Sequence, residues 1–249
     1  MRVRFSLRPP EFMELNKLNS LIELFFEIYK KKTIGDPFLE WLKPNQKKNF
    51  YTWDQVDKRI RILSKVLNKN LSLGDRVVLL SENRPEWLIA DLAIMNAGGV
   101  TGPLFTTYSQ KDYEYIINDC KPKMFIISND TQYEKIKKFI AKEAMIISFD
   151  NLCEHRDSYN HSISSTLNDI VNLYESDPKS SQQIKFDYNK NLKRNNLACI
   201  IYTSGTTGNP KGVMLSHGGV LSNCEGAQEI LEPLIKNIKP VFLTWLPLS

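Results

Sequence analysis

Short apolar runs and amphipathic segments alternate through the middle of the chain, and this alternation restricts the possible folds. Four apolar runs have the length of strands buried on both faces, at residues 77–80, 100–105, 124–127 and 145–149. A segment with apolar residues at helical spacing follows each of the first three. Because strands joined by a helix pair in parallel, the pattern predicts a three-layer α/β fold of mostly parallel sheets flanked by helices.

Capping signals mark where some of the helices begin. Ser20 with Glu23, and Thr52 with Gln55, fit the capping box, in which each side chain bonds to the other residue's free backbone N–H. The chain is predicted to form helices over residues 21–31, 52–70, 83–97, 109–119, 132–142 and 219–234. Further strands are predicted over residues 197–202 and 241–246.

Two segments differ in composition from this regular pattern. Residues 1–17 contain Arg2, Arg4 and Arg8 without an acidic residue before Glu11, and we favour a disordered leader over a targeting or membrane-surface arm. Residues 151–196 are rich in Asn, Ser, Asp and Lys around one short amphipathic helix, which predicts an exposed, variable connection. Residues 18–249 are therefore expected to hold the folded part of the chain.

Composition and charge disfavour several classes of function. The 33 Lys and Arg exceed the 28 Asp and Glu by only five dispersed charges, so no nucleic-acid partner is expected. The four cysteines form no C-x-x-C pair and only three histidines exist, so we predict free thiols in a reducing compartment and no metal site. No apolar run approaches the roughly 18 residues of a membrane span. These observations predict a cytoplasmic protein, which could associate with a membrane surface through its basic N-terminus.

One loop carries a clear chemical signal. Residues 203–212, TSGTTGNPKG, directly follow the strand predicted over 197–202 and contain three glycines, four hydroxyl side chains and one lysine. Glycines let backbone N–H groups face an anion, hydroxyls donate to phosphate oxygens, and a lysine adds a compact positive charge. The composition therefore favours a nucleoside triphosphate as ligand, with a hairpin turn that binds nothing as the alternative.

The spacing within this loop differs from that of a P-loop. Pro210 precedes Lys211, and Gly212 stands where the Walker A motif has its metal-binding Ser or Thr. The missing hydroxyl disfavours a P-loop kinase or GTPase.

The order of residues resembles a motif of another family. Residues 202–212, YTSGTTGNPKG, and the following VMLSH closely resemble the phosphate-binding motif of the AMP-forming acyl-adenylating enzymes. Upstream, YTW at 51–53, LGDRV at 73–77 and SENRPEW at 81–87 resemble the N-terminal half of long-chain fatty acyl-CoA synthetases. The resemblance covers residues 18–249, with 151–196 poorly matched.

This resemblance implies a two-step ligase reaction. A fatty acid carboxylate attacks the α-phosphorus of ATP, used with Mg²⁺, and coenzyme A then displaces AMP from the acyl-AMP. The loop would bind the β- and γ-phosphates, Lys211 would neutralise the leaving pyrophosphate, and no residue of the loop is a nucleophile. The implied phosphate-binding residues are Thr203, Ser204, Gly205, Thr206, Thr207, Gly208, Lys211 and Gly212.

The resemblance also implies that the family's fold continues past this chain. The final residues LPLS resemble the start of the family's next motif, LPLSH. The family's magnesium-binding glutamate, hinge aspartate and adenylation lysine belong to later motifs. We therefore expect residues 18–249 to be an incomplete N-terminal portion of an AMP-binding domain, inactive by itself. The alternative is a truncated, inactive remnant that at most binds polyphosphate or a protein.

Four residues near these motifs are expected to be structural. Asn83 and Trp87 more often cap a helix and pack in a core than contact a substrate. For His217 we favour packing or hydrogen bonding over acid–base chemistry, and Tyr202 is expected to act as scaffold.

Overall fold

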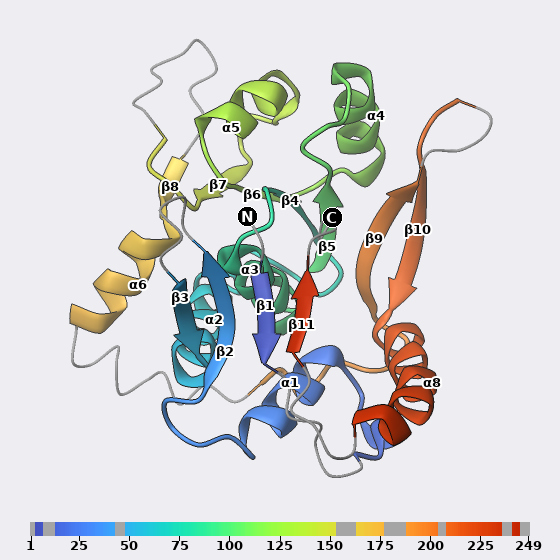
Figure 1. Cartoon of the computed structure of the whole chain (residues 1–249). Coiled ribbons are helices and arrows are strands. Elements are labelled where there is room, and N and C mark those ends of the chain that lie inside the picture. The colour runs from blue at the N-terminus through green and yellow to red at the C-terminus, as the bar shows by residue number, and fades with distance from the viewer. Residues whose placement is uncertain are drawn as a thin grey trace.

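The computed structural model describes residues 3–6, 13–42, 48–152, 163–176, 188–203, 208–235 and 241–244. Within these ranges the strands form two sheets (Figure 1). The larger sheet has the strand order β10-β9-β5-β4-β6-β7-β8, and the smaller has the order β11-β1-β2-β3. Helices cover both faces of the larger sheet, which is therefore the middle layer of an α/β fold.

The four predicted central strands are present and parallel. They are β4 (Arg76–Leu80), β5 (Val100–Leu104), β6 (Met124–Ile127) and β7 (Met145–Ser148). β4 pairs in parallel with both β5 and β6, and β6 pairs in parallel with β7. The fold prediction is thus confirmed for the part of the sheet where apolar runs and amphipathic segments alternate.

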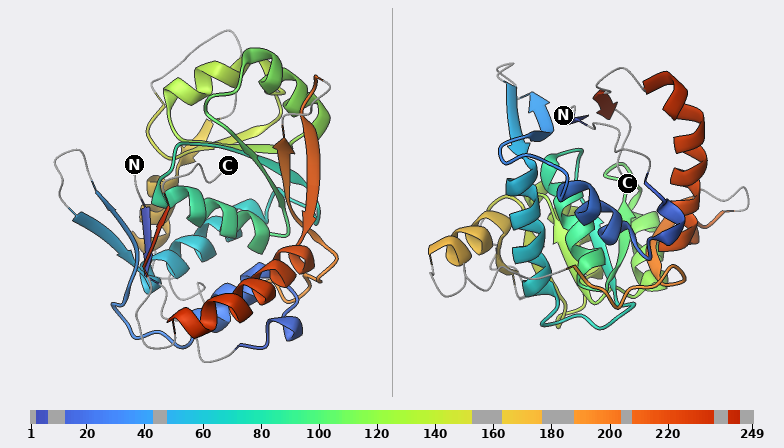
Figure 2. Two further views of the ribbon diagram at one scale, coloured as in Figure 1. Left: turned by 45° about the vertical axis from the view of Figure 1, so that its right-hand side comes forward. Right: turned by 90° about the horizontal axis from the view of Figure 1, so that it is seen from below.

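Alternate residues of each strand face opposite layers of helices. In β4, Val77 and Leu79 pack on one side, while Val78 and Leu80 pack on the other. The first layer contains α1 (Leu21–Tyr29), α2 (Trp53–Leu67) and α3 (Pro85–Asn96). The second contains α4 (Gln110–Cys120), α5 (Asp130–Ile136) and the 3₁₀ turn η2 (Lys137–Phe139). Figure 2 shows these helices on either side of the sheet.

The helix starts follow the capping chemistry. The Ser20 side chain accepts a hydrogen bond from the Glu23 N–H, and Thr52 and Gln55 form the predicted capping box of α2. α3 differs, because its N-cap is Arg84 rather than the expected Asn83, and Pro85 occupies the first turn. α5 is shorter than the predicted helix over 132–142, since Asn129 caps it and η2 follows Ile136.

Two segments expected to be irregular contain strands. Within the predicted leader, β1 (Val3–Ser6) pairs antiparallel with β11 (Val241–Thr244) and with β2. The short 3₁₀ turn η1 (Leu15–Lys17) follows, and Leu15 is buried. Within the predicted connection, β8 (Ile163–Thr166) extends the larger sheet in parallel beside β7, and α6 (Leu167–Ser176) buries Leu167, Ile170 and Val171. Residues 1–2, 7–12, 153–162 and 177–187 of these segments lie outside the described residues.

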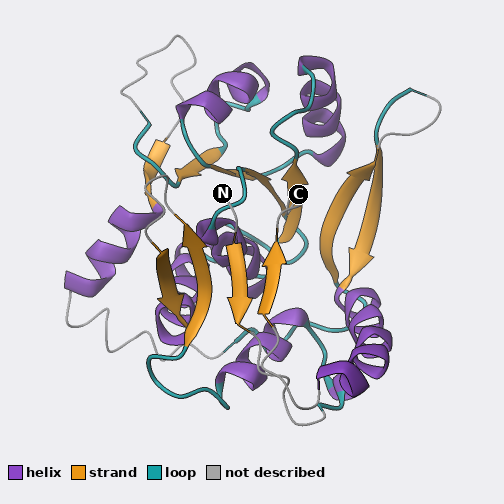
Figure 3. Cartoon of the chain, viewed as in Figure 1, coloured by secondary structure: helices purple, strands orange, loops and turns teal. Residues whose placement is uncertain are grey.

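Three strands that were not predicted, β2, β3 and β10, form two antiparallel hairpins, one of them with the predicted strand β9. One pairs β2 (Pro37–Leu42) with β3 (Lys48–Thr52), and the other pairs β9 (Leu197–Thr203) with β10 (Lys211–Ser216). β9 lies parallel to β5, so β10 forms the edge of the larger sheet (Figure 3). α8 (His217–Ile235) begins directly after β10, two residues before its predicted start.

Candidate functional site

The predicted phosphate-binding loop connects the two strands of the edge hairpin. In the antiparallel register, Thr203 lies opposite Lys211, and Tyr202 lies opposite Gly212. Four of the eight predicted residues, Thr203, Gly208, Lys211 and Gly212, are described, and all four are exposed. The other four, Ser204, Gly205, Thr206 and Thr207, lie outside the described residues. The hairpin therefore holds both ends of the loop side by side at the edge of the sheet.

The two described glycines of the loop are required for different reasons. Gly208 has φ +119°, a backbone conformation that residues with a Cβ rarely adopt, although the space around it is open. Gly212 has no such constraint on φ, but a Cβ there would lie 3.0 Å from Ile200 Cγ2 and 3.1 Å from Tyr202 Cζ. Conformation thus selects glycine at position 208, and close packing selects it at 212.

Tyr202 has the expected scaffold environment at the start of the loop. Its side chain is 2% exposed, and its hydroxyl donates a 2.6 Å hydrogen bond to Asp119 Oδ2 on α4. Burial and the Asp119 carboxylate raise the pKa of Tyr202 well above its ordinary value. Beside this contact, a pocket of about 460 Å³ is lined by Asp119 and by Asn209 of the loop. The loop and α4 are thus neighbours.

His217 lies at the end of the hairpin opposite to the loop. Its ring is fully buried, and Nδ1 accepts a hydrogen bond of 3.4 Å from the Leu21 N–H. Burial lowers the pKa of His217 to about 4, so the ring is neutral at physiological pH. A buried, neutral imidazole that ties the start of α8 to α1 has the packing and hydrogen-bonding environment that we favoured over acid–base chemistry.

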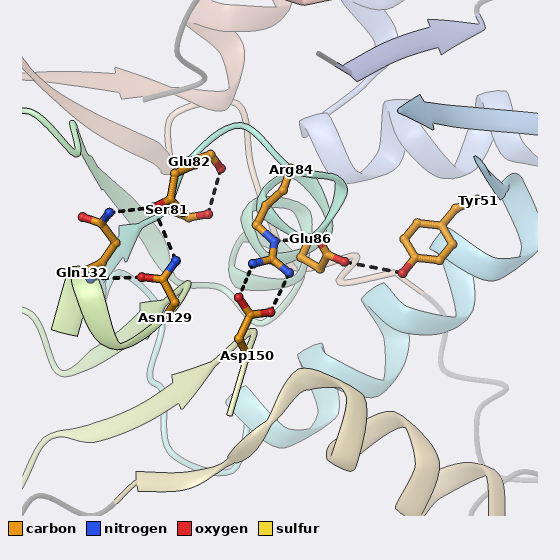
Figure 4. A network of polar contacts seen from close by, with 8 residues as sticks. All are labelled: Tyr51, Ser81, Glu82, Arg84, Glu86, Asn129, Gln132 and Asp150. Carbon is orange, nitrogen blue, oxygen red and sulfur yellow. Dashed lines mark hydrogen bonds and ion pairs between the residues drawn. The ribbon is translucent and has the colours of Figure 1, made fainter. Parts of the chain in front are cut away.

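The SENRPEW segment forms a second polar cluster, at the carboxyl end of β4 (Figure 4). The two Nη atoms of Arg84 donate hydrogen bonds of 2.9 and 3.0 Å to Asp150, which follows β7. Arg84 Nε donates to Glu86 at 2.8 Å, and the Tyr51 hydroxyl donates to the other Glu86 oxygen at 3.5 Å. Sequence reasoning missed this pairing, because Arg84 and Asp150 are 66 residues apart and only the sheet brings them together.

Glu82 extends this cluster toward α5. Its Oε1 accepts hydrogen bonds from Gln132 Nε2 at 2.6 Å and from Asn129 Nδ2 at 3.5 Å. Burial acts to raise the pKa of Glu82, but the hydrogen bonds that its carboxylate accepts outweigh burial, so the pKa lies below its ordinary value. A pocket of about 420 Å³ lies here, lined by Glu82 and Asn83 among others. Through these hydrogen bonds and ion pairs, the cluster ties α3, α5 and the β2–β3 hairpin together. Trp87 is 6% exposed and belongs to the core, as expected.

The described part of the chain offers little to a metal ion. Among those residues, no group of three or more His, Cys, Asp and Glu side chains could hold one. Cys120, Cys199 and Cys224 are free thiols, and Cys153 lies outside the described ranges. We therefore assign no Mg²⁺ ligand.

Among the described residues, no helix is both long and apolar enough to cross a membrane.

Sequence and structure comparisons agree on the class of protein that this fold and loop define. Residues 26–249 match the family model of the AMP-binding enzymes, and the chain belongs to that family.

Among curated proteins, the chain is similar to fatty acyl-CoA ligases. It is 30% identical over 192 residues to fatty acyl-CoA synthetase A of Dictyostelium discoideum, covering 75% of this chain and 27% of that protein. It is 28% identical over 227 residues to long-chain-fatty-acid–CoA ligase 5 of Rattus norvegicus, covering 86% of this chain and 32% of that protein. The chain thus spans about a third of the length of these relatives.

Solved structures share the fold. ATP-bound MatB from Rhodopseudomonas palustris superposes with a TM-score of 0.61 at 27% identity, covering 85% of this chain and 38% of that chain. A luciferase-like enzyme from the mealworm Zophobas morio superposes with a TM-score of 0.63 at 21% identity, covering 85% of this chain and 46% of that chain. The predicted resemblance to the family and the predicted fold class are both confirmed.

Proposed function

We propose that this chain takes part in the ATP-dependent activation of a long-chain fatty acid, and that its contribution is to bind the ATP phosphates. The observation that carries the proposal is the hairpin that holds Thr203 opposite Lys211 at the two ends of the TSGTTG-containing loop. Family membership and the named fatty acyl-CoA ligases among the relatives support it. The likeness to MatB, whose structure has ATP bound, supports it as well.

The geometry gives Thr203 and Lys211 related roles. Directly opposite residues of an antiparallel pair have Cβ atoms about 4.5 to 5.5 Å apart, so a hydroxyl and an ammonium can reach the same phosphate group. Among the described residues, no hydrogen bond or ion pair engages the Lys211 ammonium, which is exposed. In the proposed reaction Lys211 neutralises the negative charge that builds up on the leaving pyrophosphate, and the loop hydroxyls and N–H groups orient it.

The proposal includes the substrates of the whole reaction. ATP with Mg²⁺, a long-chain fatty acid and coenzyme A would be the small-molecule partners of a ligase that contains this sequence. The location would be cytoplasmic, with peripheral association to a membrane. For these 249 residues alone we propose phosphate binding without turnover. The family resemblance assigns the adenylation lysine and the magnesium-binding glutamate to motifs that this sequence does not contain.

A ligand series tests the proposal. The purified chain is titrated calorimetrically with ATP, pyrophosphate and AMP. A loop that holds the β- and γ-phosphates should bind ATP and pyrophosphate more tightly than AMP, which lacks both groups. Equal affinity for all three ligands, or no binding, would contradict the proposal.

A turnover assay tests the other part of the proposal, that these residues alone do not catalyse the reaction. The chain is incubated with ATP, Mg²⁺, palmitate and coenzyme A, and acyl-CoA is measured. ATP binding without acyl-CoA is the expected result, whereas acyl-CoA formation would show that the chain is a complete ligase. In the calorimetric series, equal affinity for ATP and pyrophosphate would show that the adenosine group contributes nothing to binding. That result would favour the alternative of a general polyphosphate-binding module.

A further inference from the structure

Two hydrogen bonds join Tyr202, the residue directly before the loop, to the segment that contains α4. The Tyr108 hydroxyl donates to the backbone oxygen of Tyr202 at 2.9 Å. The Tyr202 hydroxyl donates to Asp119 Oδ2 at 2.6 Å. Tyr108 lies just before Ser109, the N-cap of α4, and Asp119 lies near the end of that helix, so the main chain and the side chain of Tyr202 are both tied to the α4 segment.

These bonds act where the sheet itself gives β9 less support. β9 is aligned with β5 by the pairing of Cys199 with Thr101, and β5 ends at Leu104. Tyr202 is three residues beyond Cys199, and on its far side β10 is the last strand of the sheet. The Tyr108 hydroxyl therefore satisfies a β9 carbonyl at the point where the neighbouring parallel strand ends.

The ring of Tyr202 also fixes the other strand at the mouth of the loop. Gly212 lies opposite Tyr202, and a Cβ at position 212 would be 3.1 Å from Cζ and 3.2 Å from Cε1 of the ring. The ring thus occupies the space that a side chain at position 212 would need. This one side chain therefore ties β9 to α4 and lies close to β10 at Gly212.

Both tyrosines are themselves held in place. The ring of Tyr108 packs edge-on against Phe105, with 5.2 Å between centroids, and against Tyr113, with 6.0 Å. Tyr202 is buried in the same core cluster as Tyr113. The raised pKa of Tyr202 keeps its hydroxyl protonated, so it remains a donor to Asp119 throughout the physiological pH range.

From this geometry we propose that Tyr108, Tyr202 and Asp119 form an anchor that positions the phosphate-binding loop before ATP arrives. The inference rests on the proposed function of the loop. The three are positioning residues, since they act through Tyr202 at the end of β9 and need not touch the nucleotide. Preorganisation lowers the cost of ordering a loop on binding, so loss of the anchor should weaken ATP binding although every loop residue is retained.

The test removes one hydroxyl at a time while keeping each ring. Tyr108→Phe and Tyr202→Phe each delete one anchoring hydrogen bond. Tyr113→Phe is the matched control, because its hydroxyl also donates to a backbone carbonyl, that of Phe105 at 2.8 Å, within the same aromatic cluster. Amide hydrogen exchange is followed without nucleotide, and ATP affinity is measured by calorimetry.

We expect amide exchange in both anchor variants to be faster at residues 199–216 and unchanged in β4 and α2. We also expect both variants to bind ATP about fivefold more weakly, which corresponds to the loss of one typical hydrogen bond. The control should change neither quantity. Unchanged exchange at 199–216 would overturn the anchor. Faster exchange with unchanged ATP affinity would show that the anchor does not serve binding. If the wild-type chain does not bind ATP, the proposed function fails, and exchange still decides whether these residues hold the loop.

Discussion

At the scale of single residues, the loop depends on what surrounds its glycines. Gly212 and Gly208 belong to the same motif, but the first lies against the Tyr202 ring and the second has open space with a positive φ. From the motif, glycines are expected where backbone N–H groups face an anion, which does not distinguish the two positions. The packing at Gly212 follows from the register of β9 and β10, which places Tyr202 opposite it, and the constraint at Gly208 follows from its φ.

We expect Gly212→Ala to destabilise the fold by about 1 to 2 kcal/mol, because the added Cβ forces Ile200 or Tyr202 to move. Gly226→Ala is the matched control: Gly226 lies in α8, and a Cβ added there would have nothing within 4 Å, so alanine should be neutral or stabilise the helix slightly. Chemical denaturation measures both changes. Equal unfolding free energies for the two variants would contradict the close packing at position 212.

His217 gives the chain a defined pH dependence. Burial lowers its pKa from an ordinary 6.5 to about 4, so below pH 6.5 the unfolded chain takes up a proton that the folded chain does not. The contribution of His217 to stability should therefore be complete above pH 6.5 and fall by up to roughly 3 kcal/mol toward pH 4. Burial raises the pKa of Asp91 to about 6, which gives a slope of opposite sign in the same window.

The difference between wild type and His217→Gln isolates the histidine, because Asp91 contributes equally to both. We expect the unfolding free energy of the wild type to fall more steeply between pH 6.5 and 4 than that of the variant. Parallel pH profiles would show that His217 titrates normally in the folded chain.

At the scale of elements, local sequence patterns predicted the features that depend on residues close together in the chain, such as helix caps and buried strands. Thr52 and Gln55 form the capping box that their spacing indicates, and the apolar run of β4 is buried on both faces. The β2–β3 hairpin was not predicted, because its strands are short and carry polar residues such as Lys48 and Asn49. In the β9–β10 hairpin, β9 was predicted as a strand but its partner β10 was not. The Arg84–Asp150 ion pair was missed for another reason, since it depends on β6 separating β4 from β7.

The capping box of α2 offers a test at this scale. Thr52→Ala removes the acceptor for the Gln55 N–H and should lower the unfolding free energy by about 1 kcal/mol. Thr52→Ser keeps a hydroxyl and should restore most of that loss. Thermal denaturation with far-UV circular dichroism compares the three proteins, and an alanine variant as stable as wild type would mean that the cap contributes nothing.

At the scale of the whole molecule, the sequence predicted the parallel sheet but not the smaller antiparallel sheet, in which distant parts of the chain pair. β1 and β11 come from opposite ends of the sequence and pair with each other, and no local periodicity can indicate such a partner. The candidate site shows the same division. The order of residues alone was enough to predict its loop. The contacts of Tyr108 and Asp119 with Tyr202 could not be predicted, because they depend on how α4 packs against β9.

The central claim is that the loop between β9 and β10 binds the phosphates of ATP, and Lys211 tests it most directly. Calorimetry compares ATP binding by the wild type, by Lys211→Ala and by Lys69→Ala, which removes an exposed lysine just after α2. Loss of one hydrogen bond to a charged group costs about 1.5 to 3 kcal/mol, so Lys211→Ala should bind ATP roughly 10- to 150-fold more weakly at unchanged stability. Lys69→Ala should match the wild type. Equal ATP affinity of Lys211→Ala and Lys69→Ala would contradict the claim.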